Sequence, residues 1–210
     1  LWIKKWRRTR SCGDVIVVRF ADDIVVGFQH RSEAEEFMAE LKERFQKFRL
    51  DLNPEKTRLI EFGRYAAENR QRRGEDKPEP FDFLGFTHIC GKKRNGGFTV
   101  IRQTIRKRMQ AKLGEVKIEL LKRLHAGVPE VGKWLRSVVL GHLRYFAVPM
   151  NFHAVAVFRN RVCLMWYRAI RRRSQKHRLN WERMSRMIER WIPPARIYHP
   201  YPLRRLCVTT

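Results

Sequence analysis

The sequence predicts an α+β protein in which a mixed half precedes an all-helical half, and three observations favour this fold class. Short runs rich in β-branched residues, separated by tight turns, lie in the first 101 residues. Apolar residues at helical spacing fill residues 102–210. The charge balance changes at the same place, because 25 of the 46 Lys and Arg residues but only 5 of the 21 Asp and Glu residues follow residue 101.

The composition favours a folded chain with a polyanionic partner. Hydrophobic residues make up 43% of the 210 residues, which excludes a disordered polycation. The net charge of +25 predicts a phosphate-rich partner, with an anionic membrane surface or plain solubility as alternatives. Apolar runs such as residues 24–28 are far shorter than the ~20 residues of a membrane span. No signal peptide is visible, so we expect a cytoplasmic protein with no membrane partner.

The cysteines and histidines predict no metal cluster. Cys12, Cys90, Cys163 and Cys207 lie far apart without a CxxC pair, which favours reduced thiols over a zinc site or a disulfide framework. The seven histidines form no HxxxH or HxH pair, so we expect none of them to bind a metal or act as a general base. Because the chain begins with Leu1, we expect the numbering to start inside a longer protein or on a decayed copy.

The first predicted elements are a hairpin and a helix. Residues 14–20 and 24–28 are β-branched runs, and their apolar character on both faces predicts a hairpin buried within a larger sheet. Ser32 and Glu35 form a capping-box pattern that predicts a helix start at Ser32. The buried face of that helix is predicted from apolar residues at helical spacing, namely Phe37, Leu41, Phe45 and Phe48.

The rest of the first half predicts further strands. Residues 52–54 stop the helix, and residues 57–62 are predicted to form a strand. Residues 63–80 are polar and predict a loop with a helical turn. Residues 81–89 and 97–101 predict a last strand pair across the Gly- and Lys-rich turn between them.

The second half predicts four helices, at residues 103–125, 131–146, 152–173 and 181–191, with an extended Pro- and Tyr-rich tail at residues 192–202. Aromatic residues at helical spacing are more often core than base-stacking platforms. We therefore expect the following to lie in the core: Trp134, Phe146, Phe158 and Trp166.

Two adjacent acids, Asp22 and Asp23, lie at the turn of the predicted hairpin. Asp is common in hairpin turns, so a purely structural role is the first alternative. The turn lacks the usual Asn-Gly or Asp-Gly pair, however, and adjacent carboxylates suit hard cations such as Mg²⁺. Two such ions about 4 Å apart can stabilise phosphoryl transfer.

Residues 17–25 resemble the (Y/F)xDD motif of reverse transcriptases, especially its YADD form in group II intron-encoded proteins. The motif here is Phe20-Ala21-Asp22-Asp23, with Phe where Tyr is usual. The resemblance implies that both aspartates are catalytic metal ligands and that Phe20 and Ala21 lie near the nucleotide and the primer end. We expect the lost hydroxyl to have a modest effect on nucleotide handling.

The next blocks of that family follow in order. Residues 52–57 resemble the block that places a lysine, here Lys56, near the incoming triphosphate. Phe83, Leu84 and Gly85 resemble the primer-grip block, where Gly allows a close backbone approach to nucleic acid. The structural alternatives are a solvated lysine and, for the two apolar residues, core packing.

The basic half resembles the thumb and domain X of the same proteins, reverse transcriptase/maturases, through residues 132–146, 172–175, 180–181 and 193–202. The resemblance implies a partial polymerase palm at residues 1–101, a thumb at 102–150 and maturase domain X at 151–210. Phosphate contacts to RNA are predicted against the alternative of a solvated helix face. They are expected from Arg102, Arg106, Lys107, Arg108, Lys112, Lys133, Arg136, Arg144, Arg171, Arg172, Arg173, Lys176 and Arg178.

The implied function is RNA-directed DNA polymerisation with Mg²⁺, dNTP and a primer-template, together with binding of the intron RNA in splicing and mobility. The family's fingers and a third palm carboxylate are expected upstream of Leu1, so we expect this chain alone not to polymerise DNA. A non-catalytic RNA-binding splicing factor with a scaffold palm and a generic basic structural protein remain as alternatives.

Overall fold

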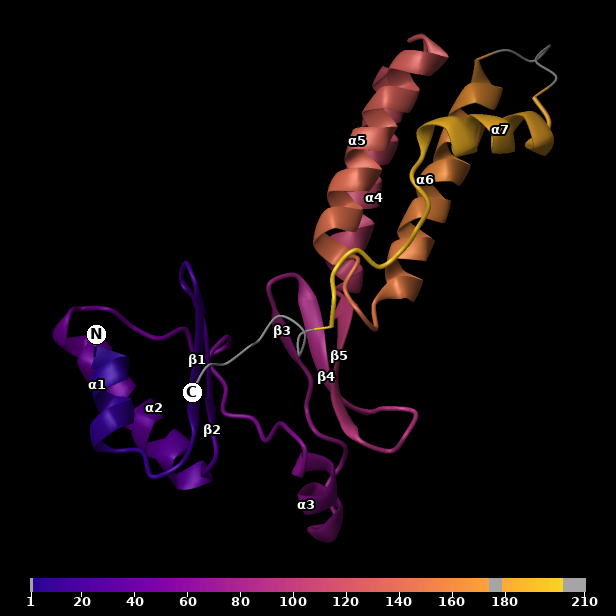
Figure 1. Cartoon of the computed structure of the whole chain (residues 1–210). Coiled ribbons are helices and arrows are strands. Elements are labelled where there is room, and N and C mark those ends of the chain that lie inside the picture. The colour runs from indigo at the N-terminus through magenta and orange to yellow at the C-terminus, as the bar shows by residue number, and fades with distance from the viewer. Residues whose placement is uncertain (1, 174–178, 202–210) are drawn as a thin grey trace. The chain divides into compact units, whose positions relative to one another are not determined.

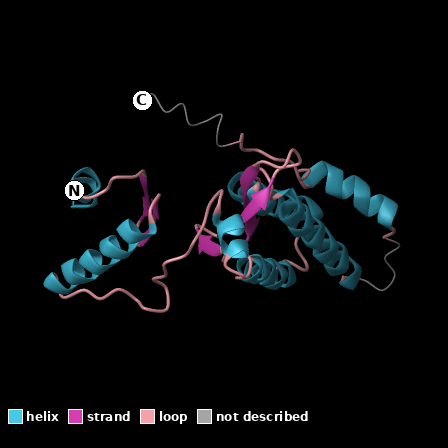
Figure 2. Ribbon diagram, turned by 90° about the horizontal axis from the view of Figure 1, so that it is seen from below, coloured by secondary structure: helices cyan, strands magenta, loops and turns pink. Residues whose placement is uncertain are grey.

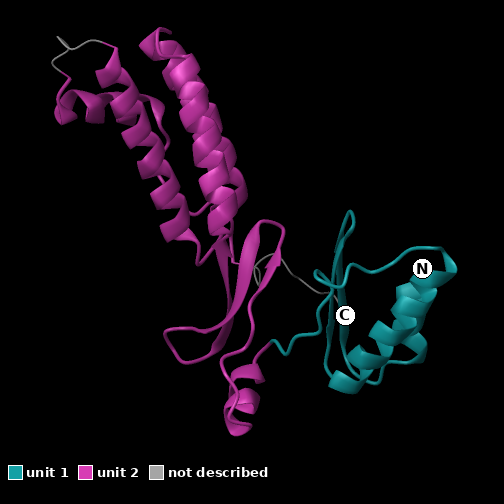
Figure 3. Ribbon diagram, turned by 180° about the vertical axis from the view of Figure 1, so that it is seen from behind, with its two compact units in different colours: residues 1–62 teal, residues 63–210 magenta. Residues whose placement is uncertain are grey.

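The computed structural model describes residues 2–173 and 179–201 of the chain, and it has the predicted α+β architecture (Figure 1). The chain divides into two compact units, residues 1–62 and residues 63–210 (Figure 3). No helix in the part that the structure describes is long and apolar enough to cross a bilayer.

The first unit pairs a hairpin with two helices. Helix α1 (Trp2–Thr9) precedes strands β1 (Val15–Phe20) and β2 (Asp23–Phe28), and helix α2 (Arg31–Lys47) follows them. The strands are antiparallel, with Val15 opposite Phe28 and Phe20 opposite Asp23. The predicted hairpin is therefore confirmed, whereas α1 is an element that the sequence did not predict.

A small aromatic core holds this unit together. Trp6, Val15 and Phe37 are buried, and Trp6 meets Phe37 edge-on with ring centroids 5.1 Å apart. Phe28 joins them at 5.2 Å from Phe37. Only the base of the hairpin is covered in this way.

The expectation of a hairpin buried within a larger sheet is wrong for this chain. The sheet has two strands, and apolar side chains along the hairpin are exposed, including Ile16 at 67% and Phe20 at 62%. The physical reason is that the helices pack against the base of the hairpin, where Val15 and Phe28 pair, and leave its tip uncovered.

Two other expectations in this unit are also wrong. Helix α2 begins at Arg31 with His30 as N-cap residue, so Ser32 lies inside the first turn and makes no cap. Residues 57–62 form no strand. Of the predicted apolar face of α2, Phe37 is buried, whereas Phe48 lies beyond the helix and is 63% exposed.

The second unit begins with a short helix and a three-stranded sheet. Helix α3 (Ala66–Arg72) is followed by β3 (Phe81–Phe83), β4 (Phe86–Lys92) and β5 (Phe98–Thr104), which are antiparallel in the order β3-β4-β5. The strand predicted at residues 81–89 is in fact two strands. Leu84 and Gly85 both have positive φ, 48° and 79°, and this turn reverses the chain between Phe83 and Phe86.

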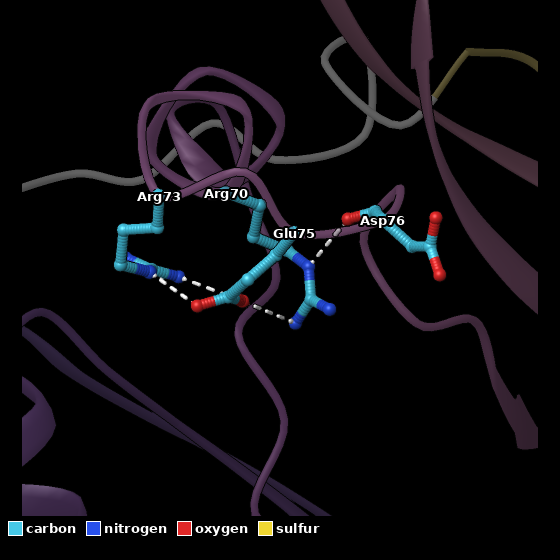
Figure 4. Close-up of polar contacts among 4 residues, drawn as sticks. All are labelled: Arg70, Arg73, Glu75 and Asp76. Carbon is cyan, nitrogen blue, oxygen red and sulfur yellow. Dashed lines mark hydrogen bonds and ion pairs between the residues drawn. The ribbon is translucent and has the colours of Figure 1, made fainter.

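Ion pairs and one hydrogen bond to the backbone connect the end of α3 to the residues just after it (Figure 4). The Glu75 carboxylate accepts from Arg73 Nε at 2.6 Å and lies 3.4 Å from Arg70 Nη1. Arg70 Nε donates to the carbonyl oxygen of Asp76 at 2.7 Å. The predicted loop with a helical turn at residues 63–80 is thus confirmed, and these polar contacts link the end of α3 to the residues that follow it.

The helical part contains α4 (Arg106–Lys122), α5 (Val128–Phe146), α6 (Phe152–Arg172) and α7 (Trp181–Trp191). These helices extend from one end of the three-stranded sheet (Figure 1), and Figure 2 shows them from below. Helices α4 and α5 both pack on α6, and α7 packs on α5. All four predicted helices are confirmed, with ends that shift by a few residues.

One core runs through this helical part. Phe158 and Trp166 are fully buried at its centre, and Trp134 and Phe146 are partly buried against it, which confirms that these aromatics serve as core. The tail after α7 is extended to residue 201 and contacts the end of α5, because Tyr198 N donates to the Ala147 carbonyl oxygen at 2.9 Å.

Candidate functional site

The acid pair lies at a tight two-residue turn. Because Phe20 pairs with Asp23, only Ala21 and Asp22 form the turn, and Ala21 adopts a positive φ of 53°. Arg19 Nε donates to the Ala21 carbonyl oxygen at 2.9 Å and closes the turn. Both residues are exposed, and carboxylate oxygens are the kind of ligand that hard cations prefer.

The loop that leads into β1 is held by Glu33 on α2. Its carboxylate accepts hydrogen bonds from Cys12 N at 2.8 Å, Gly13 N at 3.1 Å and Ser11 Oγ at 3.1 Å. These donors, the Cys12 amide foremost, hold the pKa of Glu33 below its usual value. Sequence reasoning missed this residue because its partners lie about twenty positions away and follow no local pattern.

Lys56 lies in an Asn-stabilised turn. Asn53 Oδ1 accepts from the backbone amides of Glu55 at 3.0 Å and Lys56 at 3.1 Å, and Thr57 N donates to the Asn53 carbonyl oxygen at 2.9 Å. The Lys56 side chain is exposed. The turn therefore presents the lysine on a fixed backbone, which suits either a solvated lysine or a phosphate contact.

The β3–β4 turn is anchored to the helices of its own unit. Tyr145 Oη donates to the Leu84 carbonyl oxygen at 2.9 Å, and Ile105 N donates to the Gly85 carbonyl oxygen at 3.1 Å. A Cβ at Gly85 would lie 3.4 Å from the Phe146 ring. The Phe146 ring therefore packs against this glycine, and the positive φ is a second reason for glycine here.

Phe83, Leu84 and Gly85 form the end of β3 and its turn, and the two apolar side chains are half-buried. Phe86, directly after the turn, is buried and stacks on Tyr145 at 5.9 Å between centroids. Core packing therefore accounts for part of this block.

The predicted RNA-binding residues that the structure describes lie on, or directly after, four elements. Arg102 is on β5, where burial lowers its pKa, and Arg106 begins α4. Exposed side chains on α4, α5 and the end of α6 make up most of the set, namely Lys107, Arg108, Lys112, Lys133, Arg136, Arg144, Arg171 and Arg172, with Arg173 half-buried. Lys176 and Arg178 lie outside the described residues.

A groove separates α4 from α5 and brings some of these cations together with apolar side chains. Its volume is about 380 Å³. Arg108, Met109 and Lys112 line one side, and the α5 side is lined by Ser137, Val138, Gly141, His142, Tyr145 and Phe146. Sequence reasoning found the cations but missed the α5 wall, for which the small residues Ser137 and Gly141, four positions apart, are the available signal.

His142 in this wall is neutral at physiological pH. It is 8% exposed and stacks on Phe158 with 3.6 Å between ring centroids. Burial, with a smaller contribution from the charge of Lys112, lowers its pKa to about 4. Within the residues that the structure describes, no three His, Cys, Asp or Glu side chains are grouped so as to hold a metal.

Comparison with known proteins identifies a family resemblance for the first part of the chain. Residues 2–88 match the sequence profile of the family "Reverse transcriptase (RNA-dependent DNA polymerase)". The match covers the acid-tipped hairpin, α2 and the β3–β4 turn, and it covers less than half of the chain. No curated protein matches the chain. This part is therefore similar to reverse transcriptases, and residues 89–210 lie outside the match.

Proposed function

We propose that this chain is part of an RNA-directed DNA polymerase of the group II intron reverse transcriptase/maturase type, which binds its intron RNA and assists splicing and mobility. One observation carries the proposal. The Phe20-Ala21-Asp22-Asp23 sequence forms an exposed hairpin tip inside a segment similar to reverse transcriptases, on the same chain as a helical part with a net charge of +20 over residues 102–210.

In the proposed reaction, a primer 3′ hydroxyl attacks the α-phosphorus of an incoming dNTP and pyrophosphate leaves. Asp22 is the most direct ligand for Mg²⁺ and Asp23 supports it; bound there, Mg²⁺ would offset the charge that develops on the reacting oxygens. Both side chains offer the oxygen donors that this ion prefers. Lys56 contacts the triphosphate, and Phe20 and Ala21 lie beside the nucleotide and the primer end.

The proposed division follows the family's order, with part of the palm at residues 1–101, a thumb at 102–150 and domain X at 151–210. The backbone turn at Leu84 and Gly85 holds the primer strand. Its attachment to Tyr145 on α5 supports this role, because a grip must be rigid to position a reacting end.

The test replaces one acid at the hairpin tip in the protein made from its whole reading frame. Asp22→Ala removes one metal ligand, so DNA synthesis by primer extension is expected to fall by about a hundredfold or more, while splicing assistance to the intron RNA persists. Asp14→Ala is the matched control, since Asp14 is an exposed aspartate just before β1. It should leave both activities unchanged.

If Asp22→Ala changes neither activity, the catalytic assignment is wrong. A second candidate is a non-catalytic RNA-binding splicing factor whose palm is only a scaffold. It is favoured by the charge of residues 102–210, which contain 25 basic and 5 acidic residues. This charge suits RNA binding whether or not the hairpin is catalytic. Splicing assistance by a wild-type protein that extends no primer would support this candidate.

A further inference from the structure

The groove between α4 and α5 has the size and lining of a binding site for a small flat group. Its volume of about 380 Å³ lies within the range of about 300–1,000 Å³ that small-molecule sites occupy. Met109, Val138 and Phe146 give it apolar walls. Gly141 leaves a gap in the α5 wall, because a Cβ added there would meet no atom within 4 Å.

Two cations lie on the α4 side of the groove. Arg108 and Lys112 are four residues apart and so share one face of the helix. Lys112 pairs with Glu115 at 2.7 Å, whereas Arg108 pairs with no carboxylate among the residues that the structure describes. A ligand that carries one negative charge beside a flat apolar face complements this arrangement.

The α5 wall also contains a buried polar atom that makes no hydrogen bond within the described residues. His142 Nε2 is buried and makes no hydrogen bond with any residue of the described chain. Because burial keeps this imidazole neutral, it can lie against an apolar ring without bringing a third positive charge. Tyr145 and Phe146 add aromatic surface on the same helix, with their ring centroids 4.8 Å apart.

The groove adjoins the β3–β4 turn of the same unit. Tyr145 lines the groove and also donates to the Leu84 carbonyl oxygen. Arg108 Nη1 would lie 3.7 Å from a Cβ at Gly85. A strand held at this turn therefore has the groove as its immediate neighbour.

We propose that this groove binds a single unstacked nucleotide of the nucleic acid, with its base against the apolar wall and its phosphate on Arg108 and Lys112. The inference rests on the proposed function for the presence of a nucleic acid at this unit. Stacking of a base on aromatic side chains requires no particular sequence, so any base can occupy the site. An acidic peptide is a weaker fit, because a carboxylate side chain supplies no flat apolar face for the wall.

The experiment uses the full chain and labelled duplexes that differ in one position. One duplex is fully paired, a second carries a single bulged 2-aminopurine nucleotide, and a third has an abasic residue at the bulge. Each duplex is made both as RNA–RNA and as RNA–DNA, so that the experiment shows whether the bound nucleotide comes from an RNA duplex or from an RNA–DNA hybrid. Gly141→Leu fills the groove, and Gly114→Leu is the matched control, since a Cβ at that α4 glycine also meets nothing within 4 Å and Gly114 does not line the groove.

The wild-type chain should bind the bulged duplex about tenfold more tightly than the paired or abasic ones, with a change in 2-aminopurine fluorescence. Gly141→Leu should remove both the preference and the fluorescence change while the affinity for paired duplex stays the same. Gly114→Leu should behave as wild type. Equal binding of bulged and abasic duplexes, or a Gly141→Leu chain that keeps the preference, would overturn the proposal. So would binding of an acidic peptide that Gly141→Leu abolishes, if the wild-type chain shows no preference for the bulge.

The result also separates the two proposals. Salt-sensitive binding of every duplex without a preference for the bulge would contradict the nucleotide groove and leave the proposed function in place. Absence of binding to any duplex would contradict both.

Discussion

The imidazole of His142 is a buried titratable group in the helical core, with Phe146 and Phe158 as its ring neighbours at 4.6 and 3.6 Å between centroids. Its pKa of about 4 in the folded chain compares with an ordinary value of 6.5. The unfolded chain therefore binds a proton at this residue at a higher pH than the folded chain does. Stability is at its full value above about pH 6.5, falls as the pH drops towards 4 and levels off below both values.

We expect His142→Phe to remove this acid sensitivity, because Phe keeps the ring stack and does not titrate. Between about pH 7 and about pH 4.5 the wild-type chain should lose about 2 kcal/mol more unfolding free energy than the variant loses. Urea unfolding followed by tryptophan fluorescence measures the difference. His153→Phe, at an exposed position of α6, is the control and should retain the wild-type pH response. An equal acid response in all three chains would contradict the assignment.

At the scale of elements, Asn151 joins the sheet to the helices. It is 1% exposed and lies just before α6. Its Oδ1 accepts from Thr104 N at 3.0 Å at the end of β5, and its Nδ2 donates to Thr104 Oγ1 at 2.7 Å and to the Phe146 carbonyl oxygen at 2.8 Å. One amide therefore connects β5, the end of α5 and the start of α6.

Asn151→Ala is expected to destabilise the chain by about 2–3 kcal/mol, because it removes the hydrogen bond from the buried Thr104 amide and one of the two donors to the Phe146 carbonyl oxygen, which Val148 N still contacts at 2.8 Å. Thermal unfolding of the variant measures the loss. Asn160→Ala, on the exposed face of α6, should change stability by less than about 0.5 kcal/mol. Equal effects of the two substitutions would show that the amide does not connect these elements.

The whole molecule is dominated by its positive charge. Residues 102–210 hold 25 basic and 5 acidic residues, and one of those acids, Glu119, is already shared by Lys122 and Arg123. Five acidic residues are too few to pair with 25 basic ones, so most of the positive charge in this part of the chain is not neutralised by its own carboxylates. Phosphates are the complementary groups, and their neutralisation releases counterions.

We accordingly expect a steep salt dependence of RNA binding by the chain. If about six phosphates are neutralised, the affinity should fall by about a thousandfold between roughly 50 and 200 mM salt. Filter binding or anisotropy at several salt concentrations gives the slope. Combined Arg106→Gln and Lys107→Gln substitutions at the start of α4 should make the plot of log affinity against log salt less steep. The decrease should correspond to about two fewer phosphates neutralised. An affinity that stays flat over this range would contradict phosphate-dominated binding.

Local patterns were sufficient to predict the elements whose own residues determine them. The β-branched runs predicted the β1–β2 hairpin, and apolar spacing predicted α4 to α7, because period and burial face are properties of nearby residues. The same reasoning was wrong at Ser32, because α2 already begins at Arg31 without a side-chain cap, and at residues 57–62, which form no strand. It also missed the division of residues 81–89 into two strands, since Leu84 adopts a positive φ that its residue type does not predict.

The candidate site divides in the same way. The sequence by itself determined the acid pair at a hairpin turn and the basic character of the helices, because residue type and order are enough for both. Only the tertiary structure decided that Glu33 holds the loop before β1, that Tyr145 anchors the β3–β4 turn, and that Arg108 faces an apolar wall across a groove. These contacts join residues about 20 to 60 positions apart, and such pairings depend on how elements pack, which no local pattern encodes.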